Sequence, residues 1–418
     1  MARKSRRVVI TGLGVVAPNG IGKDAFWDAL VAGKSGIDYI SAFDATPYPC
    51  RVAGQVTGFR PTDFMTARVA KHAGRFAHLA VAAANLALDD SKLQLAREVP
   101  DRVLACVGNA MNGSGDVYET ARTGFDKEGM SGIPQLSGVE FAAHAAVGHV
   151  SRELGLRGQG MTISSACSTG LDVMQWASAQ IQANAADVVI AGSTEAPISE
   201  FCFATLCAFG SISTFDDPPL LASRPFDQKR KGLVLGEGAA ICILEDLEHA
   251  LDRQATIYAE ILGFGSGNEG TVGTRIGIRR DALAHAIARA LSTAGLTVGQ
   301  IDYINAHGNA MQDYDRVDTQ AFKAVFGPTA YRIPISSIKS MIGHAMGAAA
   351  GLQVAATCLA IQNSVIPPTT NYEFKDPDCD LDYVPNEART SRIRTALVNA
   401  HAIGGTYSAL VLAAPSEP

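Results

Sequence analysis

Apolar runs rich in β-branched residues alternate along this chain with stretches in which apolar residues recur at steps of three and four. In the first half, the runs at 8–14, 103–108, 187–192 and 238–244 indicate buried strands, and 68–88 has helical spacing. This alternation predicts an α/β protein whose mostly parallel sheets are covered by helices on both faces.

The same order of elements begins again near residue 257. The strand and Gly-x-Gly turn of 8–14 are echoed at 257–265, the tetrapeptide at 108–111 recurs at 308–311, and Gly-Leu at 170–171 recurs at 351–352. Strands near 302–306, 333–337, 395–400 and 408–413 complete the second copy. Three echoes in one order predict a duplicated α/β unit. We expect two halves, 1–253 and 254–418, that form one compact body without a flexible linker.

Two further segments bear on function. The Gly- and Ser-rich stretch 112–138 predicts a long excursion of the kind that binds ligands or a second subunit, and a helix is expected near 138–154. Gly12-x-Gly14-x-x-Ala17 matches a dinucleotide fingerprint in form, but 18–22 prolongs the loop before any helix begins. We therefore expect no nucleotide cofactor.

A cysteine stands at a strand-to-helix corner. The run Thr162-Ile163 stops at small residues, Cys167 follows, and helical spacing starts at Ser168. Unpaired N–H groups and the helix dipole favour an anion there, yet a terminus contributes only about 0.3–1 kcal/mol and one pKa unit is about 1.4 kcal/mol. A reactive thiolate at Cys167 would therefore also need a cationic or basic neighbour; an inert buried cysteine is the alternative.

Composition and charge narrow the class of protein. The net charge of −6 at pH 7 argues against nucleic acid as the main partner, and the apolar window 345–361 is too short to span a bilayer. The eight cysteines form no C-x-x-C pair and no zinc-like spacing. We expect a cytoplasmic protein with reduced thiols, no bound metal and no membrane segment.

Two histidines lie at the ends of predicted strands in the second copy. His307 follows 302–306 directly, and His344 heads a Gly- and Ala-rich helix after 333–337, roughly where Cys167 lies in the first copy. The carboxyl ends of strands are where α/β proteins concentrate their chemistry. A histidine buried and satisfied in the core is the alternative for each residue taken alone.

With these residues in place, the chain resembles the β-ketoacyl-acyl-carrier-protein synthases, closest to the synthase II type and to type II polyketide ketosynthases. The resemblance runs from Val8 to Thr406 and rests on a set of motifs: Ala166-Cys167-Ser168-Thr169-Gly170, Ser223-Arg224-Pro225-Phe226-Asp227, Gly236-Glu237-Gly238-Ala239, Asn305-Ala306-His307-Gly308 and Lys339-Ser340-Met341-Ile342-Gly343-His344. It implies the thiolase fold, a five-layer αβαβα core, and decarboxylative Claisen condensation of a malonyl thioester with an acyl chain.

The resemblance also implies roles for particular residues. Cys167 would carry the acyl chain as a thioester, and His307 and His344 would stabilise the enolate. The remaining implied residues are Lys339, Asp315 and Asp318 as support, the backbone N–H groups of Cys167 and Ile403 as an oxyanion hole, Ile403, His401 and Met111 at the gate and acyl pocket, and Asn309 and Met311 at the pantetheine. No cofactor is implied, because phosphopantetheine arrives on the carrier protein.

The chain departs from the family pattern at three places. After His307 the family has Gly-Thr-x-Thr-Pro where this chain has Gly308-Asn309-Ala310-Met311, and Met311 cannot donate a hydrogen bond. The aromatic gate of the family is Ile403 here, and Asp318 stands where a glutamate is usual. These changes favour a specialised fatty-acid, polyketide or polyene-type ketosynthase over routine elongation.

The expected partners are an acyl carrier protein and either a second copy or a chain-length-factor-like subunit. Arg68, Lys71 and Arg75, on one predicted helix face, are the candidate patch for the acidic carrier protein. The alternatives are a housekeeping synthase II and a largely non-catalytic chain-length-type subunit, which Cys167 disfavours. A thiolase would need a second cysteine near Gly404-Gly405, and a papain-like hydrolase is opposed by the second histidine.

Overall fold

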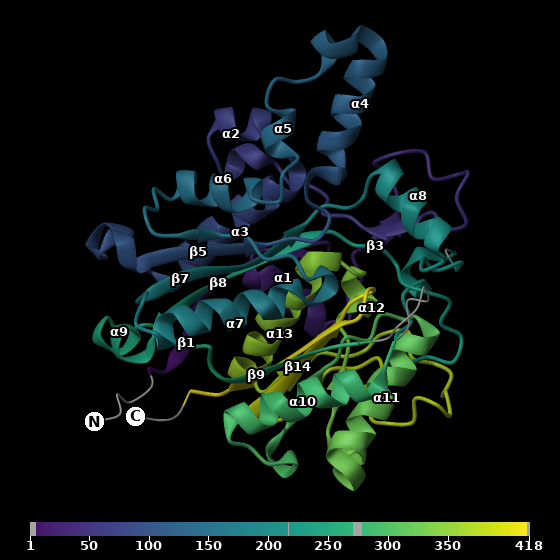
Figure 1. Cartoon of the computed structure of the whole chain (residues 1–418). Helices are drawn as coiled ribbons and strands as arrows, with labels where there is room; N and C mark the ends of the chain where they lie inside the picture. The colour runs from purple at the N-terminus through teal and green to yellow at the C-terminus, as the bar shows by residue number, and fades with distance from the viewer. Residues whose placement is uncertain (1–5, 216, 271–277, 416–418) are drawn as a thin grey trace.

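A large mixed sheet runs through the centre of the computed structural model, which describes residues 6–215, 217–270 and 278–415 (Figure 1). Its strands follow the order β11-β10-β14-β15-β9-β1-β8-β7-β5-β6, and β2 adds to β1. The strands are β1 (Val8–Ala17), β2 (Gly20–Ile21), β5 (Val103–Gly108), β6 (Gly160–Met161), β7 (Val188–Glu195), β8 (Gly238–Asp246), β9 (Ala259–Asn268), β10 (Tyr303–Asn305), β11 (Ile335–Ser336), β14 (Thr395–His401) and β15 (Thr406–Ala413). Two small sheets pair β3 (Ile37–Tyr39) with β4 (Val52–Gly54) and β12 (Val365–Ile366) with β13 (Arg389–Thr390).

The sheet consists of two five-stranded halves with the same order. The first is β1-β8-β7-β5-β6 and the second is β9-β15-β14-β10-β11, and they join where β1 pairs antiparallel with β9. The duplicated unit expected from the sequence is therefore present in the topology.

The expectation of mostly parallel sheets was wrong. Parallel pairing is confined to β5 with β6 and β7, and to β10 with β11 and β14. The pairs β1–β8, β7–β8, β14–β15, β9–β15 and β1–β9 are antiparallel. The turn 402–405 between β14 and β15 is too short for a crossover, and a short connection forces the chain back antiparallel.

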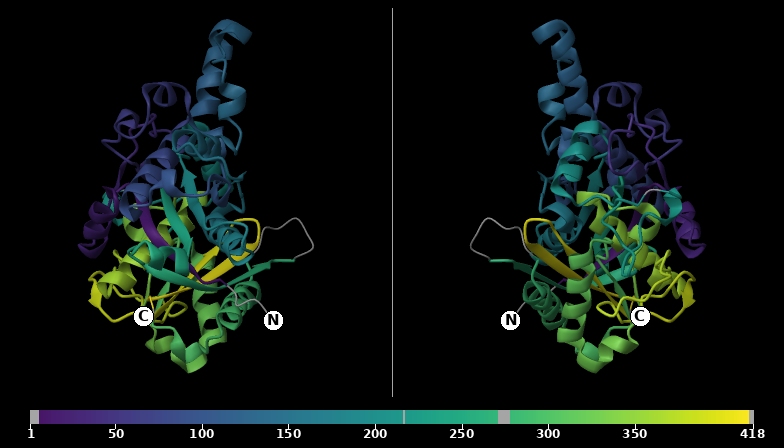
Figure 2. Two further views of the ribbon diagram at one scale, coloured as in Figure 1. Left: turned by 90° about the vertical axis from the view of Figure 1, so that its left-hand side faces the viewer. Right: turned by 90° about the vertical axis from the view of Figure 1, so that its right-hand side faces the viewer.

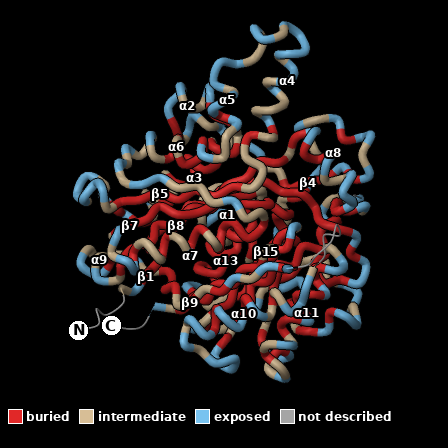
Figure 3. Tube along the Cα trace, viewed as in Figure 1, coloured by how far each residue is buried: buried red, intermediate tan, exposed pale blue. Residues whose placement is uncertain are grey.

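Helices form three layers around the two halves of the sheet. The helices are α1 (Lys23–Val31), α2 (Ala67–His72), α3 (Arg75–Ser91), α4 (Asp116–Glu128), α5 (Ser137–Glu140), α6 (Ala145–Glu153), α7 (Thr169–Gln182), α8 (Glu200–Phe209), α9 (Leu247–Asp252), α10 (Arg280–Ala294), α11 (Gln312–Phe326), α12 (Lys339–Ile342) and α13 (Ala349–Asn363). Helices α7 and α13 pack on each other between the halves, α3 and α6 cover the first half, and α10 and α11 cover the second (Figure 1). The buried trace is concentrated in the strands and in α13 (Figure 3). This is the five-layer arrangement expected of a thiolase fold.

The glycines of the echoed Gly-x-Gly motifs serve helix packing. A Cβ on Gly14 would lie 2.5 Å from the backbone nitrogen of Ala87 in α3, and one on Gly265 would lie 2.5 Å from that of Ala290 in α10. Each half therefore packs one helix closely against its first strand at a glycine. The motif at Gly12-x-Gly14 accordingly lies inside β1 and opens no phosphate-binding turn.

Two predicted helices are broken. The helix expected over 68–88 divides into α2 and α3 at Ala73, whose backbone is extended, and the helix near 138–154 divides into α5 and α6. The excursion at 112–138 contains α4 and projects from the body as an arm (Figure 2). In the described part of the chain, no helix combines the length and apolarity that a bilayer span requires.

Candidate active site

Cys167 lies in a tight turn that leads directly into α7. The 3-10 turn Ala166–Ser168 precedes the helix, and Ala166 has a positive φ of 52°, a conformation that is strained for a residue with a side chain. The Cys167 side chain is 2% exposed. Burial raises the pKa of the thiol to about 11, while the backbone N–H of Ile403 and the charge of Lys339 act in the opposite direction. The resting group is therefore a thiol beside a cation and two backbone donors, those of Ile403 and Cys167 itself.

His307 and His344 form a pair of buried imidazoles. Their ring centroids are 5.3 Å apart and the rings are nearly perpendicular. The Nδ1 atom of His344 accepts the N–H of Met346 at 3.2 Å, and that of His307 faces the N–H of His401 at 3.5 Å. Because Nδ1 accepts in each ring, the proton of each neutral imidazole belongs on Nε2. The Nε2 atom of His307 is buried and has no partner among the described residues.

Both imidazoles are held neutral. Burial is the largest cause that lowers the pKa of each histidine well below its usual value, and the Lys339 charge acts in the same direction. The Cys167 turn packs against the turn Met346–Ala348 that follows His344, and also against β14 and β15. The charge of Lys339 acts on the Cys167 thiol and on both imidazoles, so these three groups, from segments far apart in the sequence, lie around one ammonium.

Lys339 and two aspartates bind the loop that carries His307. The Lys339 ammonium donates to the carbonyl of His307 at 2.6 Å. Asp315 accepts the N–H groups of Asn309 and Ala310, and burial raises its pKa to about 7. Asp318 accepts the N–H of Gly308 at 2.8 Å. All three side chains therefore fix the loop that carries His307.

His401 lies in this polar network and not at the entrance. Its side chain is fully buried, Nε2 lies 3.0 Å from Asp318, and the ring centroid is 4.1 Å from that of His307. Tyr314 stacks on the His401 ring with a centroid distance of 5.1 Å. Ile403, two residues further on, is partly exposed in the turn between β14 and β15. His401 and Ile403 were both expected at the gate. Only Ile403 lies where it could act as a gate.

Of the residues expected at the substrate pockets, the two methionines lie near the site, whereas Asn309 is bonded within its own loop. Met111 and Met311 pack against the apolar cluster that contains Cys167, and Met311 lines a pocket of about 520 Å³ together with Tyr314. Asn309 is 2% exposed and its Oδ1 accepts the N–H of Met311, which closes a local turn. Asn309 therefore shapes this loop, whereas Met311 faces the pocket.

The proposed carrier-protein patch does not lie on one helix face. Arg68 and Lys71 are exposed on α2, but Arg75 begins α3 beyond the break. The Arg75 guanidinium binds Glu237 at 2.7 Å and the carbonyl of Val56 at 2.9 Å. The expectation that Arg75 shares a helix face with Arg68 and Lys71 was therefore wrong, and its guanidinium is engaged in an ion pair with the buried Glu237.

Two residues of the site were not anticipated. Glu195, fully buried at the end of β7, accepts the N–H groups of Ala110, Met111 and Gly347. Gln353, fully buried in α13, accepts from Lys339. A sequence signal existed for both: a carboxylate ends an apolar strand, and a carboxamide interrupts an apolar helix.

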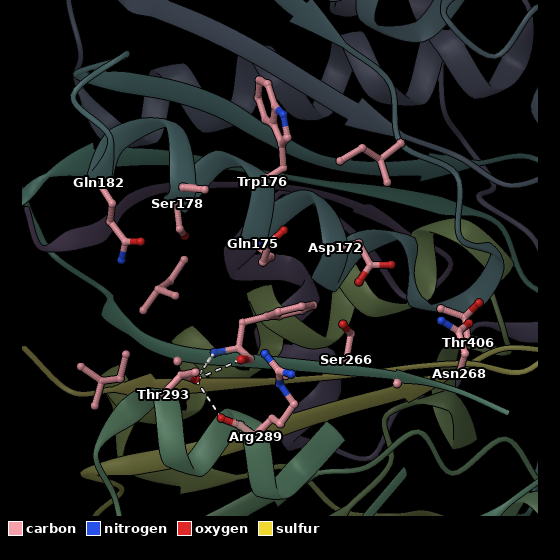
Figure 4. Close-up of a pocket in the computed structure, with 18 residues that line it drawn as sticks. Asp172, Gln175, Trp176, Ser178, Gln182, Ser266, Asn268, Arg289, Thr293 and Thr406 are labelled. Carbon is pink, nitrogen blue, oxygen red and sulfur yellow. Dashed lines mark hydrogen bonds between the residues drawn. The ribbon is translucent and has the colours of Figure 1, made fainter. Parts of the chain in front are cut away.

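A separate pocket of about 690 Å³ lies between α7 and β9 (Figure 4). Asp172, Gln175 and Trp176 line it from α7, and the Thr293 hydroxyl holds its far wall by bonding both backbone groups of Phe264. Asp172 is engaged by the hydroxyls of Ser165 and Ser408. Cys167, His307 and His344 are absent from its lining, so this pocket is distinct from the candidate site.

Comparison with known proteins agrees with this geometry. Residues 5–250 match the β-ketoacyl synthase N-terminal domain and residues 258–373 match the C-terminal domain. The chain is 42% identical, over 99% of its length and 98% of the relative's, to the tetracenomycin polyketide synthase ketoacyl synthase alpha subunit of Streptomyces glaucescens. It is 39% identical to the 3-oxoacyl-acyl-carrier-protein synthase 2 of Coxiella burnetii, over 98% of this chain and 99% of the relative.

The fold has a close counterpart among solved structures. The ishigamide ketosynthase/chain length factor superposes with a TM-score of 0.92 at 32% identity, and the match covers 99% of this chain and 100% of that one. The protein therefore belongs to the β-ketoacyl synthase family, the acyltransferases that form carbon–carbon bonds on acyl thioesters.

Proposed function

We propose that the protein condenses a malonyl thioester, with loss of carbon dioxide, onto an acyl chain held on Cys167. The observation that carries this proposal is the pair of neutral imidazoles, His307 and His344, whose Nδ1 atoms are occupied by backbone N–H groups. Their Nε2–H groups are left to bind an oxyanion without being acidic enough to quench a carbanion. A donor aimed at a developing oxyanion stabilises it by about 2.7–4 kcal/mol.

The first half-reaction loads Cys167. Its sulfur attacks the thioester carbonyl of an acyl carrier protein, a new carbon–sulfur bond forms, and the bond to the pantetheine sulfur breaks. The thiol proton of Cys167 ends on the departing pantetheine thiol. The N–H groups of Ile403 and Cys167, which already act on this sulfur, would bind the carbonyl oxygen in the intermediate.

The second half-reaction forms the carbon–carbon bond. The malonyl carboxylate leaves as carbon dioxide, and the electron pair of the broken bond becomes an enolate whose oxygen accepts from His307 and His344. The enolate carbon attacks the acyl carbonyl, and the Cys167 thiolate leaves and takes one proton from solvent. Lys339, Asp315 and Asp318 hold the loop that carries His307 and touch no reacting atom.

The substrate class we propose is a specialised fatty-acid, polyketide or polyene-type chain delivered on an acyl carrier protein. Ile403 in place of an aromatic gate and Met311 in place of a hydroxyl donor support a pocket unlike that of routine elongation. The exposed cations of α2, Arg68 and Lys71, are the proposed contact for the carrier protein. We further propose a dimer, with a second copy or with a chain-length-factor-like subunit, and a division of the chain into 1–253 and 254–418.

The experiment separates the two half-reactions. Cys167→Gln, whose side chain mimics the acylated cysteine, should decarboxylate malonyl carrier protein, and His307→Ala in that background should lose this activity. Intact-protein mass spectrometry after incubation with a panel of acyl carrier proteins should show an acyl adduct on the parent protein and none on Cys167→Gln. A Cys167→Gln protein that is folded but releases no carbon dioxide would overturn the proposed roles.

A second candidate function is housekeeping fatty-acid elongation. It is favoured by the 39% identity to 3-oxoacyl-acyl-carrier-protein synthase 2 over nearly the full length of both chains. The acyl panel discriminates between the two: saturated chains taken up across a wide range of lengths indicate elongation, and selective uptake of an unsaturated or β-keto chain indicates the specialised function.

A further inference from the structure

The turn before α7 and the turn before α13 have the same construction in the two halves. Each is a 3-10 turn of three residues, Ala166–Ser168 and Met346–Ala348, and each continues directly into its helix. Both turns begin at a residue of positive φ, 52° in the first turn and 43° in the second, which is strained for a residue with a side chain. The second residues, Cys167 and Gly347, are therefore counterparts, and so are their backbone N–H groups.

These two N–H groups have different partners. The N–H groups of Cys167 and Ile403 act on the Cys167 sulfur, and in the proposed function they bind the substrate oxygen. The N–H of Gly347 donates instead to Oε2 of Glu195 at 3.1 Å. The carboxylate of Glu195 thus takes the N–H group that corresponds, in the other half, to the one offered to the substrate by Cys167.

The Glu195 carboxylate joins the two halves of the molecule. Its Oε2 also accepts the N–H of Ala110 at 2.7 Å, and both of its oxygens lie 3.1 Å from the N–H of Met111. These donors follow β5 in the first half, whereas Gly347 belongs to the second half. A Cβ on Gly347 would lie 2.6 Å from Oε2 and 2.6 Å from the Ala110 nitrogen, so this close approach requires a glycine.

The surroundings of Glu195 favour its ionised form. Its side chain is fully buried, and every hydrogen bond that the carboxylate accepts in the described part of the chain comes from a backbone N–H. Burial raises the pKa of Glu195 to about 7, and these N–H groups act in the opposite direction. A carboxylate that only accepts matches donors that only donate. Above its pKa the side chain is therefore a built-in anion.

The turn that Glu195 holds also sets the tautomer of His344. Met346 directly precedes Gly347, and its N–H donates to Nδ1 of His344 at 3.2 Å. The proton of the neutral ring then belongs on Nε2, which is the donor that the proposed function requires. Because the two N–H groups belong to one tight turn, a turn released at Gly347 would also lose its alignment with Nδ1.

We propose that Glu195 is a positioning residue of the condensation: its carboxylate fills the counterpart of the oxyanion hole, and by holding the Gly347 N–H it keeps the Met346 N–H on Nδ1 of His344. The inference rests on the proposed function in taking His344 as a donor to the enolate oxygen. It also has a consequence of its own. When the side chain is shortened, the same N–H groups should bind a small free carboxylate.

Chemical rescue by formate tests this role. Glu195→Ala removes the carboxylate and leaves its N–H donors, and formate supplies one carbon and two oxygens of the same charge. In the Cys167→Gln background, Glu195→Ala should slow malonyl decarboxylation by about 10²-fold, the loss expected when a catalytic group is misplaced by about 1 Å. Sodium formate should restore most of the lost rate and should saturate, whereas sodium chloride at equal ionic strength should restore none of it.

Asp302→Ala is the matched control. The Asp302 carboxylate also accepts two backbone N–H groups, those of Arg394 and Thr395, but it precedes β10, whereas His307 follows that strand. In the Cys167→Gln background this variant should decarboxylate at the rate of Cys167→Gln alone, with or without formate. An equal formate response in Asp302→Ala would overturn the inference.

The decisive results come from Glu195 itself. A folded Glu195→Ala protein that decarboxylates at the undiminished rate, or whose lost rate formate does not restore, would overturn the inference. If Glu195→Ala does not fold, Glu195→Gln decides. Its amide nitrogen cannot accept an N–H, so decarboxylation should again be slower, and an undiminished rate would overturn the inference.

The tautomer of His344 supplies a readout that needs no substrate. With isotope-labelled histidine, and with His344→Gln to assign its NMR signals among those of the nine histidines, the parent protein should show the Nε2–H tautomer alone. Glu195→Ala should show a mixture of tautomers, and formate should return it to one. These changes in a protein whose Cys167→Gln variant releases no carbon dioxide would overturn the proposed function and leave the role of Glu195 standing. An unchanged tautomer in Glu195→Ala would overturn the role of Glu195 alone.

Discussion

Gly170→Ala should destabilise the protein and slow the loading of Cys167. Gly170 lies in the first turn of α7, three residues after Cys167, where α7 meets α13. A Cβ there would lie 2.8 Å from the carbonyl carbon of Ala350 and nearer still to the backbone nitrogen of Gly351, whereas ordinary contact begins at 3.4 Å. Backbone atoms cannot rotate away, so the two helices must separate by about 1 Å.

The size of the effect follows from two opposing terms. Alanine is favoured over glycine in a helix by up to about 1 kcal/mol, and overpacking costs about 1–3 kcal/mol, with a backbone clash at the upper end. The free energy of unfolding should therefore fall by about 2 kcal/mol. Because a 1 Å misplacement can slow a reaction by about 10²-fold, acyl transfer to Cys167 should slow by that order.

Gly148→Ala supplies the matched control. Gly148 lies within α6 and a Cβ on it would meet nothing within 4 Å, so the same change should raise the free energy of unfolding by up to about 1 kcal/mol. Urea titration measures stability, and single-turnover loading followed by intact mass measures the rate. Equal urea midpoints and equal loading rates for the two variants would refute the close packing of α7 on α13.

Three further outcomes are expected. The hydrogen bond to Glu245 raises the pKa of His249 to about 9. His249→Gln should therefore lower the free energy of unfolding by about 1–3 kcal/mol at pH 6, and this difference should disappear as the pH rises from 6.5 to 9. A constant difference from pH 6 to 9.5 would contradict this. His401→Phe should raise the pKa of His307, because the charge of His401 is the largest cause after burial that lowers this pKa. The acidic limb of the pH–rate profile for malonyl decarboxylation should then move to higher pH. An unchanged limb would exclude this coupling between His401 and His307. Arg75→Ala should lower the free energy of unfolding by about 3 kcal/mol by leaving a buried carboxylate unpaired, whereas Lys71→Ala, at an exposed site, should leave urea stability unchanged.

The sequence alone determined the class of fold, the duplication and the key corner. The pattern of apolar residues within a segment predicts which of its positions are buried, and this pattern can be read without knowing what the segment packs against. The echo of Gly12-x-Gly14 at Gly263-x-Gly265 proved to mark equivalent strands, because each strand takes a helix at close range in its own half. The motif around Cys167 similarly carried enough local information to place the thiol at the start of α7.

The tertiary structure decided strand direction and the partner of each polar side chain. Periodicity does not record whether a buried strand pairs parallel or antiparallel; for β14 and β15 the short turn between them required the antiparallel pairing. Arg75 binds Glu237 across 162 residues, His401 meets Asp318 across 83, and Lys339 meets His307 across 32. From the sequence alone, each of these side chains could be a solvated or a gate residue. Only the folding of each half brings together the distant charges and carbonyls that decide its role.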